Sequence, residues 1–67
     1  MEALRLWRER AGISQKTLAD EFGVKQATIS MWETGECVPA PKNLRKLSQR
    51  TGLSYDVLLD NPKRKRA

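Results

Sequence analysis

The stretch QKTLADEFGVKQATISMWET, residues 15–34, constrains the fold of this chain more than any other part. Two apolar pairs at helical spacing, Leu18 with Phe22 and Ile29 with Trp32, lie on either side of a single glycine, Gly23. Residues three or four apart share one face of a helix, and glycine adopts the left-handed backbone of a tight turn at little cost. The stretch therefore predicts two short helices, 15–22 and about 25–34, that cross at a sharp corner. Val24 would fill this corner, and the small Ala19 would allow close approach.

The flanking sequence predicts three more helices, at about 2–11, 41–51 and 55–59. A glycine followed two residues later by a serine, as expected for a helix C-cap and the next N-cap, separates predicted helices at Gly12–Ser14 and Gly52–Ser54. The side chains expected to be buried are Leu4, Trp7, Ala11, Leu18, Phe22, Val24, Ile29, Trp32, Leu44, Leu47, Leu53 and Leu58. We therefore expect an all-α fold, a compact five-helix bundle.

Residues 1–60 are expected to form a single domain, and residues 61–67 a disordered basic tail. The formal net charge is +5, but the run Lys63–Arg66 supplies most of the surplus, so the folded part carries only about +1. Bulk charge therefore does not identify a polyanion as the partner. The tail either adds non-specific affinity for a polyanion or serves only to keep the chain in solution.

The chain has one cysteine, Cys37, and no histidine. A lone thiol cannot form an internal disulfide, and a zinc site would need carboxylates alone, so no metal site is expected. No residues are arranged for acid–base or nucleophilic catalysis, and no glycine-rich phosphate loop is present. We therefore expect no enzyme activity, no catalytic residue, no cofactor and no small-molecule ligand. A chain stable on core packing alone, with a lone thiol, suits a reducing cytosol, so a cytoplasmic protein is expected. No apolar run reaches the length of a membrane span, so no membrane partner is expected.

Many ordered positions of the chain resemble the phage repressor and Cro type (Xre type) of helix-turn-helix regulators. The matching residues are Arg8, Gly12–Gln15, Leu18–Ala19, Gly23–Val24, Ile29–Ser30, Trp32–Glu33, Gly35, Pro39, Leu44, Leu47, Gly52–Ser54 and Leu58–Leu59. The resemblance covers Leu4 to Leu59 and implies a bundle of the phage-repressor DNA-binding-domain type with a central helix-turn-helix. It also implies a sequence-specific regulator of transcription that binds double-stranded DNA at an operator-like site. Such a protein is expected to be a repressor encoded by a bacterium or a phage.

The predicted helix 25–34 turns Ile29 and Trp32 inward, so its opposite face would lie in the major groove. The residues expected to contact base edges are Lys25, Gln26, Ala27, Ser30 and Met31. The amide of Gln26 carries a donor and an acceptor, which complements adenine, whereas alanine and methionine suit thymine methyl groups. The residues expected to contact phosphates, the first two by resemblance, are Gln15, Thr28, Lys16, Lys42 and Asn43.

Two residues break the local rules for helix ends. Lys25 cannot accept a bond from the free N–H groups at a helix start, so it either contacts a base or phosphate or is a solvated turn lysine. Glu33 places a carboxylate at the negative end of a helix, where it needs a cation. The resemblance implies that Arg8 provides this cation in a structural ion pair, and two independent surface charges are the alternative. Gln15 is also expected to buttress the amide of Gln26.

The resemblance also implies a dimer surface formed by Cys37, Val38, Pro39, Tyr55 and Val57. These side chains lie off the predicted core and would be exposed in a monomer. Because the patch is modest, we expect a weak homodimer that is strengthened on paired half-sites of DNA. The alternative is a protein-interaction module, or an antitoxin-type regulator, on the same fold. A steep fall of DNA affinity with salt would distinguish a DNA-binding regulator from a protein-interaction module.

Overall fold

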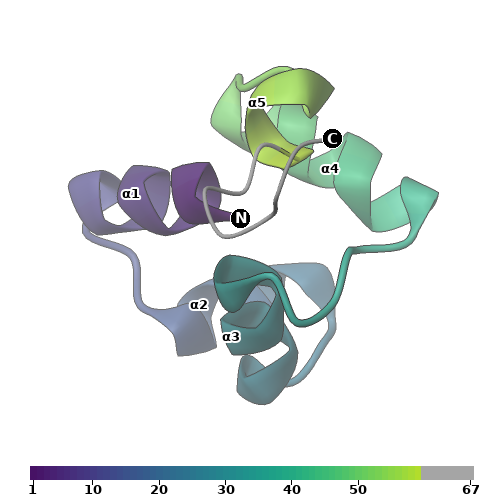
Figure 1. Ribbon diagram of the computed structural model, residues 1–67. Helices are drawn as coiled ribbons and strands as arrows, with labels where there is room; N and C mark the ends of the chain where they lie inside the picture. The colour runs from purple at the N-terminus through teal and green to yellow at the C-terminus, as the bar shows by residue number, and fades with distance from the viewer. Residues whose placement is uncertain (60–67) are drawn as a thin grey trace.

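The computed structural model describes residues 1–59, and this part of the chain holds five helices and no strands (Figure 1). The helices are α1 (Glu2–Ala11), α2 (Gln15–Phe22), α3 (Gln26–Thr34), α4 (Pro41–Thr51) and α5 (Tyr55–Leu59). The expected all-α five-helix fold is confirmed, while the expected basic tail at 61–67 lies outside the described residues. Within residues 1–59, no helix is both long and apolar enough to span a bilayer.

Three connections between helices are corners of three residues each. In every one, a glycine with positive φ ends one helix, an apolar residue follows, and the third residue precedes the next helix: Gly12–Ser14, Gly23–Lys25 and Gly52–Ser54. At Gly23, φ is 65°, a left-handed conformation that glycine adopts without a side-chain clash. The next N–H group, of Val24, donates to the main-chain oxygen of Ala19 at 3.0 Å, which closes the cap of α2.

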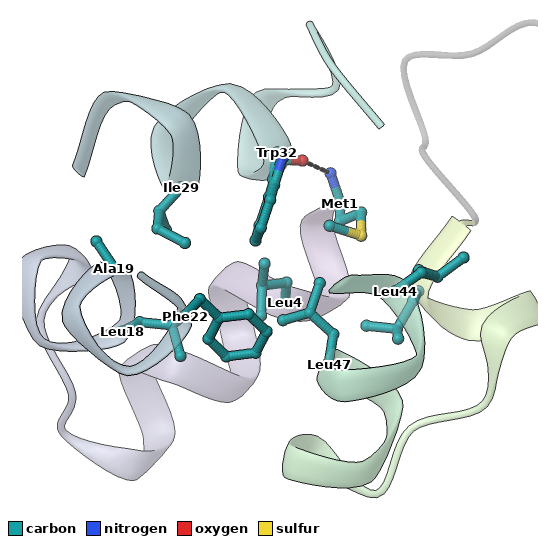
Figure 2. Packing of buried hydrophobic residues seen from close by; sticks show 10 residues of the cluster. Met1, Leu4, Leu18, Ala19, Phe22, Ile29, Trp32, Leu44 and Leu47 are labelled. Atoms are coloured by element: carbon teal, nitrogen blue, oxygen red, sulfur yellow. Dashed lines mark hydrogen bonds between the residues drawn. The ribbon is translucent and has the colours of Figure 1, made fainter. Parts of the chain in front are cut away.

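The core lies where the five helices meet. Each helix contributes one side chain with no exposed surface: Leu4 from α1, Leu18 from α2, Ile29 from α3, Leu47 from α4 and Leu58 from α5. Figure 2 shows the buried side chains converging around Leu4. The rings of Phe22 and Trp32 meet edge to face, with centroids 6.0 Å apart and an interplanar angle of 78°. Because Leu4 of α1 and Leu47 of α4 belong to the same cluster as these rings, α1 and α4 also hold the helix-turn-helix.

Burial differs from the expectation at the edges of this core. Ala11, expected in the buried stripe of α1, is exposed, because α1 ends there and Gly12 turns the chain away. Trp7, Val24 and Leu53 pack against the core but are only partly buried. Val24 and Leu53 lie in corners between helices, where they pack against the edge of the core.

Met1 is buried, which the sequence did not indicate. Its amino group donates to the main-chain oxygen of Trp32 at 2.5 Å and to that of Glu33 at 3.0 Å (Figure 2). Carbonyl groups in the last turn of a helix lack partners within the helix, and a positive group suits the negative end of the helix dipole. The start of α1 is therefore joined to the end of α3.

Two basic side chains join α4 to the end of α2. The Nζ of Lys46 donates to the main-chain oxygen of Glu21 at 2.9 Å and lies 4.7 Å from the centre of the Phe22 ring. The Nε of Arg50 donates to the Glu21 carboxylate at 2.8 Å, and its guanidinium lies over the ring of Trp7. Because Arg50 donates this hydrogen bond, the pKa of the Glu21 carboxyl lies below its ordinary value. Lys46 and Arg50 are thus engaged within the monomer.

Leu18→Ala should lower the free energy of unfolding by about 2–5 kcal/mol, because it leaves a cavity where the helices meet. Leu6→Ala is a matched control, since Leu6 lies on α1 with 43% of its surface exposed. The control should change the free energy of unfolding by less than about 0.5 kcal/mol. Urea denaturation followed by far-ultraviolet circular dichroism measures both. Equal losses in the two variants would contradict this placement of the core.

Candidate nucleic-acid interface

Helix α3 presents a polar surface on the side opposite the core. Its apolar anchors, Ile29 and Trp32, are buried. The residues expected to contact base edges divide by exposure: Lys25, Gln26 and Ala27 are exposed, and Ser30 and Met31 are partly buried. The start of α3 is therefore its most accessible part, as an approach to base edges from a helix N-terminus requires.

The start of α3 lacks the cap that the other two three-residue corners have. The Oγ of Ser14 accepts from the N–H of Thr17 at 3.0 Å, and the Oγ of Ser54 accepts from the N–H of Val57 at 3.3 Å. Lys25 holds the equivalent position and makes no such bond. The exposed lysine and the positive end of the helix dipole together favour an anion at this corner.

A nearly buried ion pair holds the other end of α3. The Nε of Arg8 donates to the Oε2 of Glu33 at 2.6 Å, and its Nη2 donates to Oε1 at 3.3 Å. Only 13% of the Arg8 side chain and 3% of the Glu33 side chain are exposed. The hydrogen bond to Glu33 raises the pKa of the Arg8 guanidinium. Arg8 also donates to the main-chain oxygen of Ile13 at 2.9 Å, so it joins α1, the first corner and α3.

Two glutamines extend this ion pair to the exposed end of α3. The Nε2 of Gln15 donates to the Oε1 of Glu33 at 2.9 Å. The Nε2 of Gln26 lies 3.5 Å from the Oε1 of Gln15, a long contact on the exposed side. The sequence indicated the contact between the two glutamines but not the one between Gln15 and Glu33. No sequence signal relates Gln15 to Glu33, because these two residues meet only where α2 crosses α3.

The residues expected to contact phosphates lie on three helices. Gln15 and Lys16 begin α2, Thr28 lies in α3, and Lys42 and Asn43 lie in the first turn of α4. Lys16 and Lys42 are exposed, while the other three are partly buried. Lys16 pairs with Asp20 at 3.3 Å, but more than two thirds of both side chains is exposed, so this pair is weak.

Four of the five residues of the expected dimer surface are exposed, and one is buried. Cys37, Val38, Tyr55 and Val57 are exposed. Pro39 is buried within the monomer, so its expected exposure is wrong. Its apolar ring is already removed from water, so a second copy has nothing to gain by covering it.

Comparisons with known proteins agree with this architecture. The sequence model of the helix-turn-helix family matches residues 4–58. An uncharacterised HTH-type transcriptional regulator derived from the SPbeta prophage, YonR of Bacillus subtilis strain 168, is 38% identical over 58 residues. The matched region covers 87% of this chain and 54% of that protein, so the chain spans about half the length of the curated relative. No solved structure matches the chain significantly.

Glu33→Ala should lower the free energy of unfolding by about 2–4 kcal/mol, because it leaves the mostly buried guanidinium of Arg8 without its carboxylate. Glu9→Ala is the control, since Glu9 pairs with Arg5 on the exposed face of α1. The control should leave the melting temperature nearly unchanged. Thermal unfolding followed by circular dichroism compares the two. A loss no larger for Glu33→Ala than for Glu9→Ala would contradict a structural role for the pair.

Proposed function

Because the chain belongs to the helix-turn-helix family of the phage repressor and Cro type, we propose that it is a regulator of transcription that binds double-stranded DNA sequence-specifically. In this proposal α3 lies in the major groove with its start against the base edges. The observation that carries it is the exposed amide of Gln26 at the front of a helix whose other end is fixed by the Arg8–Glu33 pair. A rigidly held helix with a free polar front is what recognition of base edges requires.

Gln26 is proposed to make a bidentate contact with one adenine, since its amide offers one donor and one acceptor to N7 and N6. Lys25 can only donate, so it would contact guanine or a phosphate. Ala27 and Met31 present methyl groups that suit thymine, and Ser30 can donate or accept. These contacts would be made in each half-site.

Phosphate contacts are proposed for Gln15, Thr28, Lys16, Lys42 and Asn43. They lie at the starts of α2 and α4 and within α3, so they could hold the DNA backbone on both sides of the major groove. Phosphate contacts of this kind position a protein on DNA without selecting sequence. Because the folded part carries a low net charge, the positions of these phosphate contacts matter more than the electrostatic attraction of the whole domain for DNA.

We further propose that the protein acts as a repressor by occupying its operator as a dimer in the bacterial cytoplasm. The exposed side chains of Cys37, Val38, Tyr55 and Val57 support a surface between two copies. The surface is small, so pairing would be weak in solution and stronger when both copies are held on one DNA molecule.

Gln26→Ala should weaken binding to the preferred duplex by about 1–3 kcal/mol and relax the preference at one base pair. The preferred duplex is obtained by selection from a random pool with the unaltered protein. Titrations of labelled duplexes at several salt concentrations measure affinity and its salt dependence. The slope of affinity against salt should stay unchanged, because no phosphate contact is lost.

Gln49→Ala is a matched control for the Gln26 variant, because Gln49 is an exposed glutamine on α4 beside Arg50. It should alter neither base preference nor affinity. Equal weakening of Gln26→Ala on every sequence would show that Gln26 contacts the backbone instead. A shallow salt dependence of the unaltered protein would argue against DNA as the partner altogether.

A duplex with two inverted half-sites about one helical turn apart should bind more tightly than a duplex with one half-site. Val57→Asp should reduce the affinity for the paired duplex to nearly that for the single one, since it places a charge in the proposed dimer surface. Binding to the single half-site should stay the same. Full affinity of the unaltered protein for single half-sites would contradict the dimer.

A further inference from the structure

We propose that the buried carboxylate of Glu33 selects the base that Gln26 recognises. It does so through Gln15, which determines which end of the Gln26 amide faces the DNA. This inference rests on the proposed contact between Gln26 and a base. It assigns to Glu33 a role in sequence preference although the residue is buried and two side chains away from the groove.

The first step is the fixed position of the carboxylate. Both oxygens of Glu33 accept from Arg8, at 2.6 Å and 3.3 Å, and only 3% of the side chain is exposed. An ionised carboxylate accepts hydrogen bonds and donates none. Any amide that contacts it must therefore present its nitrogen.

The second step orients Gln15. Its Nε2 donates to the Oε1 of Glu33 at 2.9 Å. The reverse orientation would place the carbonyl oxygen of Gln15 against a carboxylate oxygen, with no proton between them. The Oε1 of Gln15 therefore points away from Glu33, and it is the atom that Gln26 approaches.

The third step orients Gln26. Its Nε2 lies 3.5 Å from the Oε1 of Gln15 and donates toward it. One N–H and the carbonyl oxygen of the amide are left for the groove. This pair complements adenine, which offers N7 as acceptor and N6 as donor. Guanine offers two acceptors at this edge and leaves the carbonyl oxygen of Gln26 without a donor.

Glu33 is thus a positioning residue whose charge specifies the direction of two successive amides. A neutral residue of the same shape would not impose this direction. An amide at position 33 can present either its oxygen or its nitrogen to Gln15, so Gln15 and then Gln26 could adopt both orientations. The amide of Gln26 would then no longer be held in the orientation that complements adenine.

Glu33→Gln tests the proposal. The readout is the ratio of affinities for two duplexes that differ at one base pair, which is A·T in one and G·C in the other. This is the base pair at which the Gln26→Ala variant loses its preference. We expect Glu33→Gln to lower this ratio about two- to tenfold, the factor that one net hydrogen bond provides. Titrations of both duplexes with one preparation, below its melting temperature, make the ratio independent of the fraction that is folded.

Two further variants separate the direction of the amides from stability. Gln15→Met removes the link but keeps Arg8 with Glu33, so it should lower the ratio as Glu33→Gln does and lower the melting temperature less than Arg8→Lys does. Arg8→Lys removes the forked hydrogen bonds but keeps a cation and the carboxylate, so it should lower the melting temperature and keep the ratio. If Glu33→Gln does not fold, Gln15→Met carries the test alone.

Three results would overturn the proposal. An unchanged ratio in Gln15→Met, with Gln26→Ala still indifferent to the base, would reject the link and leave the base contact standing. A ratio that falls in Arg8→Lys as far as in Glu33→Gln would show that preference follows stability. A ratio that Gln26→Ala leaves intact at every base pair would reject the proposed base contact itself, and the link with it.

Discussion

The ion pair between Arg8 and Glu33 is the contact on which the arrangement of the helices most depends. A carboxylate in the last turn of α3 opposes the helix dipole and is nearly buried, so on its own it would be costly. It is stable because a guanidinium from α1 and an amide from α2 both donate to it. Three helices therefore share one charged group, and the position of α3 follows from satisfying it. Removing one partner of such a pair leaves a buried charge without compensation, which costs more than the pair itself contributes.

Contacts from α1 hold the end of α3, contacts from α4 hold the end of α2, and the start of α3 is left exposed. The amino group of Met1 bonds to the last carbonyls of α3, and Arg8 bonds to Glu33, so α1 is attached to the end of α3 at two points. Lys46 and Arg50 of α4 hold the end of α2. None of these contacts involves Lys25, Gln26 or Ala27, which stay exposed. The scaffold thus fixes a helix whose accessible residues can vary without disturbing the fold.

The helix boundaries could be predicted because each depends on residues within a few positions, such as Gly12 with Ser14. Glu33 could be recognised as a residue in need of a cation, since a conflict with the helix dipole is also local. The bond from Gln15 to Glu33 and the burial of Met1 and Pro39 depend on how distant helices cross, and periodicity carries no information on that. The base and phosphate contacts stay predictions, because they depend on DNA. The structure adds which polar side chains bond to each other: Arg8 and Gln15 donate to Glu33, and Gln26 donates toward Gln15.

The three-residue corners have a consequence for how such a chain can change in length. Each has only three residues: a glycine ends one helix, an apolar residue packs against the core, and the third residue precedes the next helix. An insertion at Gly12–Ser14 or at Gly23–Lys25 would rotate one helix against another and separate Arg8 or Gln15 from Glu33. Within residues 1–59, the loop of residues 35–40 is the one connection longer than three residues. Insertions and deletions are therefore best tolerated in this loop, where they would alter the proposed dimer surface while α3 keeps its place.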